Sequence, residues 1–586
     1  MRGKRLGSVG EIRSPKAEPL FTRQSVFCAL LLAACVLAVW PVVEIGINDD
    51  WSYVLTTRIF AETGHFVYNG WATTILGWQV IWGALFARVF GSSFTALRMS
   101  VVPIDLATAL LYHAILRRFG LNKSHATLGT LTLVLSPLFL PLGTTFMSDV
   151  PGFFPLVLCV YLCQLAVDAS SDNAARAWLI TAALTNIALG TVRQTAWLGV
   201  LVVVPCCGWL LRRRRYVVPL TIGLWVLGHL CVRVTLHWFL RQPYAVPYFV
   251  LGGHADLLAL ERLLRNGLYL ALTAILLCLP ALATGLSTVF PLRRRAMLRG
   301  GVLLLLFIAL VAVFHHQGRT LALAPPWLGT TIDYSGLWNC FNLLSSRSDP
   351  AVGMLLFLLC CLACLWAFLE TLNRGPIDKK VQSAHVRWRT ASILLLPLLL
   401  CYAVLLIPGS AFARVFDRYL LVIVPVVLFY ILGWHQERVS ARVPAIAVLV
   451  LIVFAWVGVA STHDLFAKER ARLQLLDELQ RAGVPRTAIR GQFAFDAMTQ
   501  IDAWGYVNEP AIVNPAGAYH PRPEETGPCA YWFSRYVPVI QALYEVETQP
   551  NPCVGASQFA PVPYRAWLPP GKMYVWAGSL PGSGGR

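Results

Sequence analysis

Long apolar runs separated by short polar segments dominate the sequence. About thirteen of these runs are long enough to cross roughly 30 Å of hydrocarbon as a helix. The pattern therefore predicts a mainly α-helical membrane protein whose chain crosses the bilayer many times. The runs lie near residues 25–45, 98–117, 125–143, 152–168, 175–191, 196–211, 216–237, 267–290, 300–314, 351–371, 390–408, 417–434 and 443–461.

Basic residues cluster in the short polar segments, and this clustering predicts the topology. Cytoplasmic loops of membrane proteins carry an excess of Lys and Arg. If the N-terminus is cytoplasmic and the runs alternate sides, every strongly basic short loop falls on the cytoplasmic face. Because the number of runs is odd, the C-terminal region falls outside. The basic loops are residues 116–124, 212–215, 293–299, 373–389 and 435–442.

This topology divides the chain into three parts. Residues 1–24 form a basic cytoplasmic tail, residues 25–461 form the transmembrane module, and residues 462–586 form an external soluble domain. The first apolar run has no clear cleavage site after it, so we expect a retained first helix rather than a signal peptide. The first external loop then covers residues 46–97.

The first external loop contains a further apolar run, residues 71–90, in which Arg88 lies. Counting this run as a span would invert the location of all later basic loops. We therefore expect an interfacial or re-entrant helix, with its tryptophans at the level of the lipid headgroups.

The external C-terminal region has the pattern of a small α/β domain. It opens on a helix with one apolar face, which ends at Gly483, and continues with short strand-like pieces. Cys529 and Cys553 lie in this region and are candidates for a disulfide. Cys340 is also external, and the spacing does not choose among the pairings.

Composition supports a membrane protein and argues against a nucleic-acid partner. Of the 586 residues, 57% are hydrophobic and 13% are charged, which is far more apolar than a soluble protein of this size. The net charge of +19 comes from short clusters between apolar runs, so we expect contact with anionic lipid headgroups and no nucleic acid. The sequence also has no phosphate-binding glycine loop, which argues against a nucleotide-driven machine.

Two adjacent carboxylates, Asp49 and Asp50, directly follow the first apolar run. A helix cap is one interpretation, because an Asp side chain accepts free N–H groups of the first turn and favours the helix dipole. Catalysis is the other, because a carboxylate at the membrane surface is suited to take a proton from a hydroxyl. Only one of the two is needed as the cap, most simply Asp50, which leaves Asp49 as the candidate base.

Four further charged residues are expected at the same external surface. Asp149 precedes Pro151 in a short external turn, where a helix cap is again the simplest explanation. Arg193 interrupts an apolar segment, and Arg414 and Arg418 flank the start of a later span. A single arginine at this depth often extends to lipid phosphate, whereas three on one face are suited to form a phosphate clamp.

The order of these motifs resembles that of the bacterial GT-C-fold glycosyltransferases, above all the protein O-mannosyltransferases and the lipid A aminoarabinose transferase. The motifs are a basic N-terminus, a first apolar run, "NDDWSY" with "AETGHFVYNGWATT" behind it, and then "SDVP", "RQT" and "DRYLL". The resemblance covers residues 25–461, and it implies a GT-C-type fold with an external C-terminal domain.

The resemblance also implies a role for each matching residue. Asp49 matches the catalytic carboxylate, with Asp50 beside it. Asp149 matches a residue that positions the acceptor or a bound ion. Arg193 and Arg418 are implied to lie near the donor phosphate.

The implied activity is transfer of a sugar from a polyprenyl-phosphate donor to an external acceptor, with inversion at the anomeric carbon. The implied location is the bacterial inner membrane, with the C-terminal domain in the periplasm. The acceptor is expected among envelope proteins, lipids or glycans, and the sugar is left open. No cofactor is required by this interpretation, because arginines stabilise phosphate charge, although a divalent metal ion is compatible with it.

Two other classes of protein fit parts of the pattern. A transporter or lipid-sugar flippase also has many spans and intramembrane arginines, but it typically carries charges near the bilayer midplane and shows paired internal repeats. Here the carboxylates lie at the ends of spans, and no two halves are evident. A catalytically silent scaffold whose external domain binds envelope components is the third class.

Overall fold

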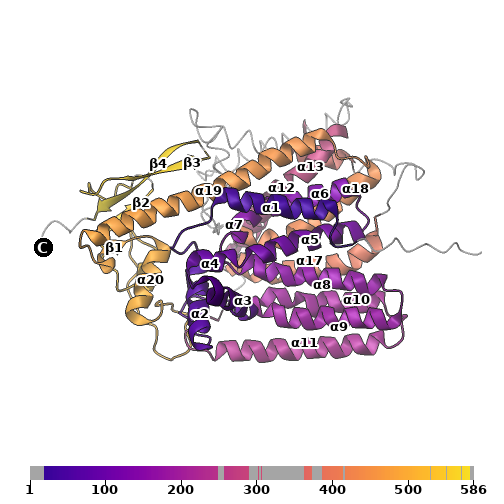
Figure 1. Cartoon of the computed structure of the whole chain (residues 1–586), viewed down its shortest axis with the longest axis horizontal. Helices are drawn as coiled ribbons and strands as arrows, with labels where there is room; N and C mark the ends of the chain where they lie inside the picture. The colour runs from indigo at the N-terminus through magenta and orange to yellow at the C-terminus, as the bar shows by residue number, and fades with distance from the viewer. Residues whose placement is uncertain are drawn as a thin grey trace, which may run out of the picture.

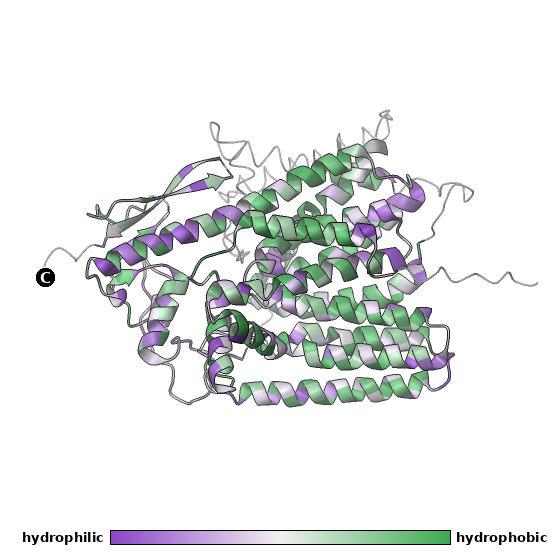
Figure 2. Cartoon of the chain, in the orientation of Figure 1, coloured by the Kyte–Doolittle hydropathy of each residue, from purple (hydrophilic) through white to green (hydrophobic). Residues whose placement is uncertain are grey.

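The structure, a computed structural model, is a helical bundle with a small sheet at one end (Figure 1). Most bundle helices run side by side, and their residues are mostly hydrophobic (Figure 2). The mainly α-helical class predicted from the apolar runs is confirmed. The structure describes residues 19–247, 257–288, 301–302, 305, 362–371, 386–412, 416–527, 529–548, 551–568 and 570–580.

The described part of the bundle contains long helices together with short helical pieces. Its helices are α1 (Arg23–Val39), α5 (Val102–Arg118), α6 (Lys123–Val134), α7 (Phe139–Gly143), α8 (Asp149–Asp168), α9 (Asp172–Leu189), α10 (Val204–Leu210), α11 (Val217–Leu240), α12 (Leu257–Leu277), α13 (Leu279–Leu282), α17 (Trp388–Phe412), α18 (Ile423–Arg438) and α19 (Ala445–Arg481). The short helical turns are η1 (Gly190–Val192), η2 (Gln194–Trp197), η3 (Gly199–Val203), η4 (Ala283–Thr288) and η6 (Asp417–Leu421).

Within the described residues, six helices are long and apolar enough to cross a membrane. The chain is therefore a multi-pass membrane protein. The predicted spans 300–314 and 351–371 lie largely outside the described residues, so the count of thirteen stays a prediction. The six helices are Phe94–Arg118, Asp149–Asp168, Asp172–Val192, Val217–Leu240, Trp388–Ile407 and Ala445–Arg481.

The presence or absence of proline explains where two helices differ from the predicted runs. The first helix ends at Val39, before the predicted 45, because Trp40 adopts a left-handed conformation and Pro41 cannot continue the helix. By contrast, the run predicted to end at 461 and the next helix, predicted to end at Gly483, form one continuous helix, α19, which ends at Arg481, since no proline interrupts it. The part of α19 that extends beyond the bundle is hydrophilic (Figure 2).

The described parts of the basic loops lie at the end of the bundle opposite the C-terminal sheet (Figure 1). Arg118 and Arg387 both pair with Asp168, at 3.0 and 2.7 Å. Beside them, Arg214 donates to the carbonyl of Ala169 at 2.6 Å. The common face predicted from the charge pattern is thus observed for the described residues of these loops, whereas residues 293–299 and 373–385 lie outside the described residues. Further contacts join 116–124 to 435–442.

The first external loop forms α2 (Asp50–Thr63), α3 (Gly77–Phe90) and α4 (Phe94–Met99), at the other end of the bundle (Figure 1). Helix α3 falls on the run predicted to be interfacial, and its 14 residues are too few to cross roughly 30 Å. Ile81, Leu85 and Val89 recur at helical spacing and are exposed, as expected for the lipid-facing side of an interfacial helix.

The described residues of the C-terminal region contain both a helix and a small sheet, and the division of the chain at residue 462 stays a prediction. Helix α20 (Phe493–Trp504) accompanies a sheet with the strand order β1-β2-β4-β3. The pair β1–β2 is parallel, and the pairs β2–β4 and β3–β4 are antiparallel. The sheet packs against α19, which connects this domain to the bundle. The strands are β1 (Ile489–Arg490), β2 (Tyr544–Glu547), β3 (Val562–Trp567) and β4 (Pro570–Ser579).

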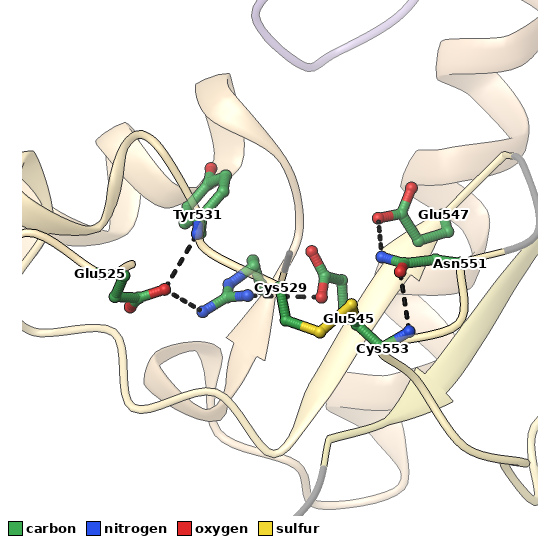
Figure 3. Close-up of a disulfide and its surroundings, with 8 residues drawn as sticks. Glu525, Cys529, Tyr531, Glu545, Glu547, Asn551 and Cys553 are labelled. Carbon is green, nitrogen blue, oxygen red and sulfur yellow. Dashed lines mark hydrogen bonds and ion pairs between the residues drawn. A yellow bond between two sulfur atoms is a disulfide. The ribbon is translucent and has the colours of Figure 1, made fainter. Parts of the chain in front are cut away.

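A disulfide joins Cys529 to Cys553 in this domain, with their Cα atoms 5.5 Å apart (Figure 3). Beside it, the guanidinium of Arg490 lies 3.4 Å from a carboxylate oxygen of Glu545 and 3.6 Å from one of Glu525. The candidate disulfide is therefore present. Disulfides persist in oxidising compartments, which agrees with the external location expected for this domain.

Asp496 is a fully buried acid of the C-terminal region. Its carboxylate accepts hydrogen bonds from the Gly491 N–H at 2.8 Å and from the Tyr531 hydroxyl at 2.7 Å. Burial raises the pKa of Asp496 to about 7, although these two hydrogen bonds oppose the shift. The fold therefore holds this carboxyl in its protonated form more readily than the unfolded chain does.

We expect the stability of this domain to fall as the pH rises from about 4 to about 7. Between its ordinary pKa of 3.8 and the raised pKa, Asp496 binds more proton in the folded state than in the unfolded state. Asp496→Asn should remove that part of the pH dependence in thermal unfolding of the full chain at pH 5 and pH 8. The control is Asp502→Asn, because Asp502 is an exposed acid of the same helix. This substitution should leave the pH dependence of thermal unfolding unchanged. Equal pH dependence in wild type and Asp496→Asn would contradict this prediction.

Candidate active site

Two aspartates and two arginines from distant parts of the sequence meet at the end of the bundle near the C-terminal domain. Asp49 immediately precedes α2, and Asp149 is the first residue of α8. Arg193 lies between η1 and η2, and Arg418 lies in η6. We call these four residues the charged cluster. All four were predicted from the sequence to lie on one face of the membrane, and the fold brings them into contact.

Opposite charges alternate through the charged cluster. Arg418 Nη1 lies 3.2 Å from Asp49 Oδ2, and Arg418 Nε lies 3.8 Å from Asp149 Oδ1. Arg193 Nη1 also pairs with Asp149 Oδ1. The Asp149 side chain is 2% exposed, whereas that of Asp49 is 15% exposed. Asp49 is therefore the more accessible carboxylate of the two.

Local backbone features place Asp149 and Arg193 against each other. Asp149 lies in the first turn of α8, where the helix dipole favours a negative charge. Arg193 has an extended backbone between two helical turns. Gly152 faces it from α8, and a Cβ at that position would lie 3.2 Å from the Cβ of Arg193. The absence of a side chain at Gly152 thus allows the arginine to approach the start of α8.

Asp49 occupies the N-cap position of α2, but its side chain makes no capping hydrogen bond. Instead, Asp49 Oδ1 accepts the indole N–H of Trp71 at 2.8 Å, and Oδ2 faces Arg418. Both oxygens are thus held by groups outside the helix. A side-chain cap is therefore the wrong interpretation for Asp49.

Asp50 points away from the charged cluster into the protein interior. Asp50 Oδ2 lies 2.8 Å from Arg98 Nε, and both side chains are 0% exposed. Asp50 Oδ1 accepts the N–H of Ile47 at 2.6 Å, a residue that precedes the helix. Arg98 also donates to the carbonyls of Val43 and Ile45 at 2.7 and 2.6 Å. Asp50 therefore holds the segment before α2 rather than acting as a simple cap.

The charged cluster keeps its guanidinium groups in the charged form. The carboxylates of Asp49 and Asp149 lie 3.2 and 3.8 Å from the guanidinium of Arg418 and stabilise its positive charge. Nearby, burial and the charge of Asp49 raise the pKa of Tyr53, so its phenol stays neutral. The four formal charges of the cluster sum to zero.

The third predicted phosphate-binding arginine, Arg414, lies outside the described residues. A phosphate clamp of three arginines therefore stays a prediction. Of the two arginines that are described, Arg418 has an unused donor, because its Nε is buried and has no hydrogen-bond partner among the described residues.

A narrow apolar cavity begins close to the charged cluster. On α8, its lining residues fall 4, 7, 8 and 11 positions after Asp149, which is the spacing of a single helix face. They therefore extend roughly 16 Å along the helix from the charged end. Helices α5, α17 and α18 supply the rest of the wall. The lining residues are Tyr112, Ile115, Leu116, Phe119, Phe153, Leu156, Val157, Val160, Leu395, Leu398, Val422, Pro425, Val426 and Phe429.

The charged cluster does not have the donor set of a metal centre. Across the residues that the structure describes, no three His, Cys, Asp or Glu side chains gather in a group suited to a metal ion. Asp49 and Asp149 are each paired with a guanidinium, whose positive charge disfavours a divalent cation beside it. The described residues thus assign no metal ion to this cluster, and the compatibility of the protein with a divalent metal ion stays an open part of the prediction.

Sequence reasoning missed two residues that shape the site. Arg98 is the first residue of the predicted span 98–117. An arginine at that depth in a membrane protein is usually paired with an acidic residue, so the sequence did indicate that Arg98 has a partner. Trp71 lies in the loop between α2 and α3, 22 positions after Asp49. No periodicity or spacing rule connects those two positions, so only the fold identifies this contact.

No family model and no curated protein matches the chain. Among solved structures, the chain is similar to ArnT from Cupriavidus metallidurans, with 14% identity and a TM-score of 0.30 over 70% of this chain and 77% of that chain. It is also similar to the archaeal oligosaccharyltransferase AglB from Archaeoglobus fulgidus, with 12% identity and a TM-score of 0.36 over 88% of this chain and 63% of that chain.

A third similar structure is the protein O-mannosyltransferase Pmt1-Pmt2 complex of S. cerevisiae, with 12% identity and a TM-score of 0.32 over 38% of this chain. The chain spans 34% of that protein's length. These structural neighbours are GT-C glycosyltransferases, the group that the order of motifs in the sequence resembles.

Proposed function

We propose that the protein is an integral-membrane glycosyltransferase that moves a sugar from a polyprenyl phosphate to an acceptor hydroxyl at the external membrane surface. The observation that carries the proposal is the position of the accessible carboxylate Asp49. It lies beside Arg418, at the end of the bundle where the apolar cavity begins. A proton acceptor, phosphate-binding groups and an apolar cavity are what this reaction requires of a protein.

In this proposal, each part of the donor binds the part of the protein that suits its chemistry. Its phosphate binds Arg193 and Arg418, because guanidinium groups hold phosphate oxygens through paired N–H donors. Its lipid tail is proposed to lie along the apolar residues of α8 and α18 that line the small cavity. Its sugar then lies on the external side of the phosphate, within reach of Asp49.

In the reaction, Asp49 takes the proton from the acceptor hydroxyl as the acceptor oxygen attacks the anomeric carbon. The bond between the anomeric carbon and the phosphate oxygen breaks, and its electron pair leaves with the lipid phosphate. Arg193 and Arg418 stabilise the charge that develops on that phosphate. Attack from the side opposite the phosphate inverts the anomeric centre.

The other two acids have supporting roles in this proposal. Asp149 is paired with both arginines, so it fixes the positions of the groups that bind the phosphate. Asp50 pairs with Arg98 and holds the backbone from which Asp49 projects. The acceptor is a hydroxyl-bearing component of the bacterial envelope, and the C-terminal domain lies on the periplasmic side of the inner membrane.

The decisive experiment uses the purified full chain in lipid nanodiscs with undecaprenyl-phosphate hexoses and pentoses labelled in the sugar. We expect the wild type to release undecaprenyl phosphate from at least one of these donors, with label passing to added envelope extract or to water. Movement of labelled lipid across a vesicle membrane without any sugar release would instead support a flippase and overturn the proposal.

Arg418→Gln is expected to weaken binding of undecaprenyl phosphate about tenfold or more, because a charged hydrogen bond to the phosphate is lost. Binding is measured by titrating undecaprenyl phosphate into nanodiscs that contain the full chain. Arg212→Gln is the matched control, because Arg212 lies in the basic loop at the opposite end of the bundle. Equal affinities of Arg418→Gln and Arg212→Gln would contradict the phosphate assignment.

A further inference from the structure

We propose that Trp71 is a positioning residue for Asp49 and that, through it, the C-terminal domain sets the geometry of the catalytic carboxylate. This inference rests on the proposed function of Asp49 as the base. The indole Nε1 of Trp71 donates to Asp49 Oδ1 at 2.8 Å, while Arg418 holds Oδ2 at 3.2 Å. Two fixed donors, one on each oxygen, define the plane of the carboxylate.

The C-terminal domain surrounds the ring of Trp71. The ring centroids of Phe493, Phe533 and Tyr536 lie 5.2, 5.5 and 5.6 Å from it, all in edge-to-face arrangements. The remaining aromatic neighbour, Trp51 of α2, is tilted at 6.0 Å. Edge-to-face packing of this kind fixes ring orientation as well as position. The direction of the indole N–H therefore depends on the C-terminal domain.

The backbone next to Trp71 is fixed by the same domain. The N–H of Val507 donates to the carbonyl of Asn69 at 2.9 Å, and the Asn69 side chain donates to the carbonyl of Ser52 on α2 at 2.9 Å. Gly70 has a φ of +81°, and a Cβ there would lie 2.5 Å from the carbonyl oxygen of Val507. Only glycine permits this approach, so the loop is built to lie against the C-terminal domain.

The N–H of Gly70 also donates to the carbonyl of Tyr244, after α11, at 2.9 Å. The loop is thus held from α2, from the C-terminal domain and from the end of α11. A general base must lie within hydrogen-bond reach of the proton that it takes, and small displacements of such a group are costly. The C-terminal domain therefore contributes to the chemical step through Trp71, in addition to any contact that it makes with the acceptor.

The test is Trp71→Phe in the full chain, which keeps an aromatic ring in the pocket and removes the N–H donor. We expect kcat for release of undecaprenyl phosphate to fall by about tenfold to one hundredfold, as for loss of a hydrogen bond to a charged group. The KM for the labelled donor and the affinity for undecaprenyl phosphate should stay within about twofold of wild type. A general loss of structure would lower binding as well.

Trp82→Phe is the matched control. The indole of Trp82, also in the first external loop, donates to the carbonyl of Ser100 at 2.7 Å, so the same substitution removes a hydrogen bond that does not involve Asp49. Its kcat should stay within about twofold of wild type. Equal losses of kcat in the two variants, or a rise in KM alone for Trp71→Phe, would overturn the positioning role.

A second arm tests the contribution of the C-terminal domain. Phe493→Leu keeps the indole N–H of Trp71 but weakens the aromatic packing around its ring. We therefore expect a several-fold lower kcat with unchanged affinity for undecaprenyl phosphate. The double variant Trp71→Phe/Phe493→Leu should be no slower than Trp71→Phe alone, because both changes act on one contact. If the fold-losses of kcat of the two single variants multiplied in the double variant, the proposed coupling would be wrong.

The same assay separates this inference from the proposed function. If the wild type released no undecaprenyl phosphate, the proposed function itself would be wrong. If the wild type were active and Trp71→Phe had the same kcat, only this inference would be wrong.

Discussion

Asp49→Asn is expected to lower the rate of undecaprenyl-phosphate release by about 10²- to 10⁴-fold, the usual contribution of a general base. Asparagine has the shape of aspartate but cannot take the proton of the acceptor hydroxyl. The arginines that bind the phosphate remain in place, so the affinity for undecaprenyl phosphate should change little. The measurement is the initial rate of release from a labelled donor at saturating concentration, with the full chain in nanodiscs.

Asp172→Asn is the control for this prediction, because Asp172 lies at the opposite end of the bundle, beside Arg214. It should release undecaprenyl phosphate at the wild-type rate. If Asp49→Asn matched that rate, Asp49 would not be the base. If Asp49→Asn instead lost affinity for undecaprenyl phosphate with an unchanged maximal rate, its role would be in donor binding.

Asp50→Ala is expected to destabilise the fold by about 3–5 kcal/mol, the cost of leaving a buried charge without its partner. Both Asp50 and Arg98 are 0% exposed, so water cannot replace the lost carboxylate. The carbonyls of Val43 and Ile45 still accept from Arg98, but they carry no compensating charge. The free energy of unfolding is measured by denaturant titration of the purified chain.

An exposed ion pair provides the control for this second prediction. Asp172 is 46% exposed and lies 3.8 Å from Arg214, so Asp172→Ala should cost less than about 1 kcal/mol. The double variant Asp50→Leu/Arg98→Met should recover much of the stability, since an apolar pair replaces a buried ion pair at little net cost. A loss for Asp50→Ala no larger than that for Asp172→Ala would contradict the structural role of this pair.

The sequence determined the class of protein and the common face on which the residues of the charged cluster lie. Hydrophobic burial and the thickness of the bilayer set the length of each apolar run, so the runs predicted the long helices from composition alone. The distribution of basic loops predicted which helix ends lie together. The predicted topology alone placed four residues on one face of the membrane: Asp49, Asp149, Arg193 and Arg418.

Helix ends were less predictable than helix positions. The end of the first helix at Trp40 and the continuation of α19 to Arg481 depend on single residues that end or permit a helix. They also depend on the elements against which each helix packs. Hydropathy averaged over a window does not register either effect.

The tertiary structure alone decided how the charges pair and which of two adjacent aspartates faces the site. Successive residues at the start of a helix point about 100° apart, so Asp49 and Asp50 cannot both face the charged cluster. The buried Arg98 takes Asp50, and Asp49 is left to Arg418 and Trp71. The sequence does not reveal the partners of either aspartate, because these contacts join positions separated by up to 369 residues. Only packing of the folded chain brings such positions within hydrogen-bonding distance.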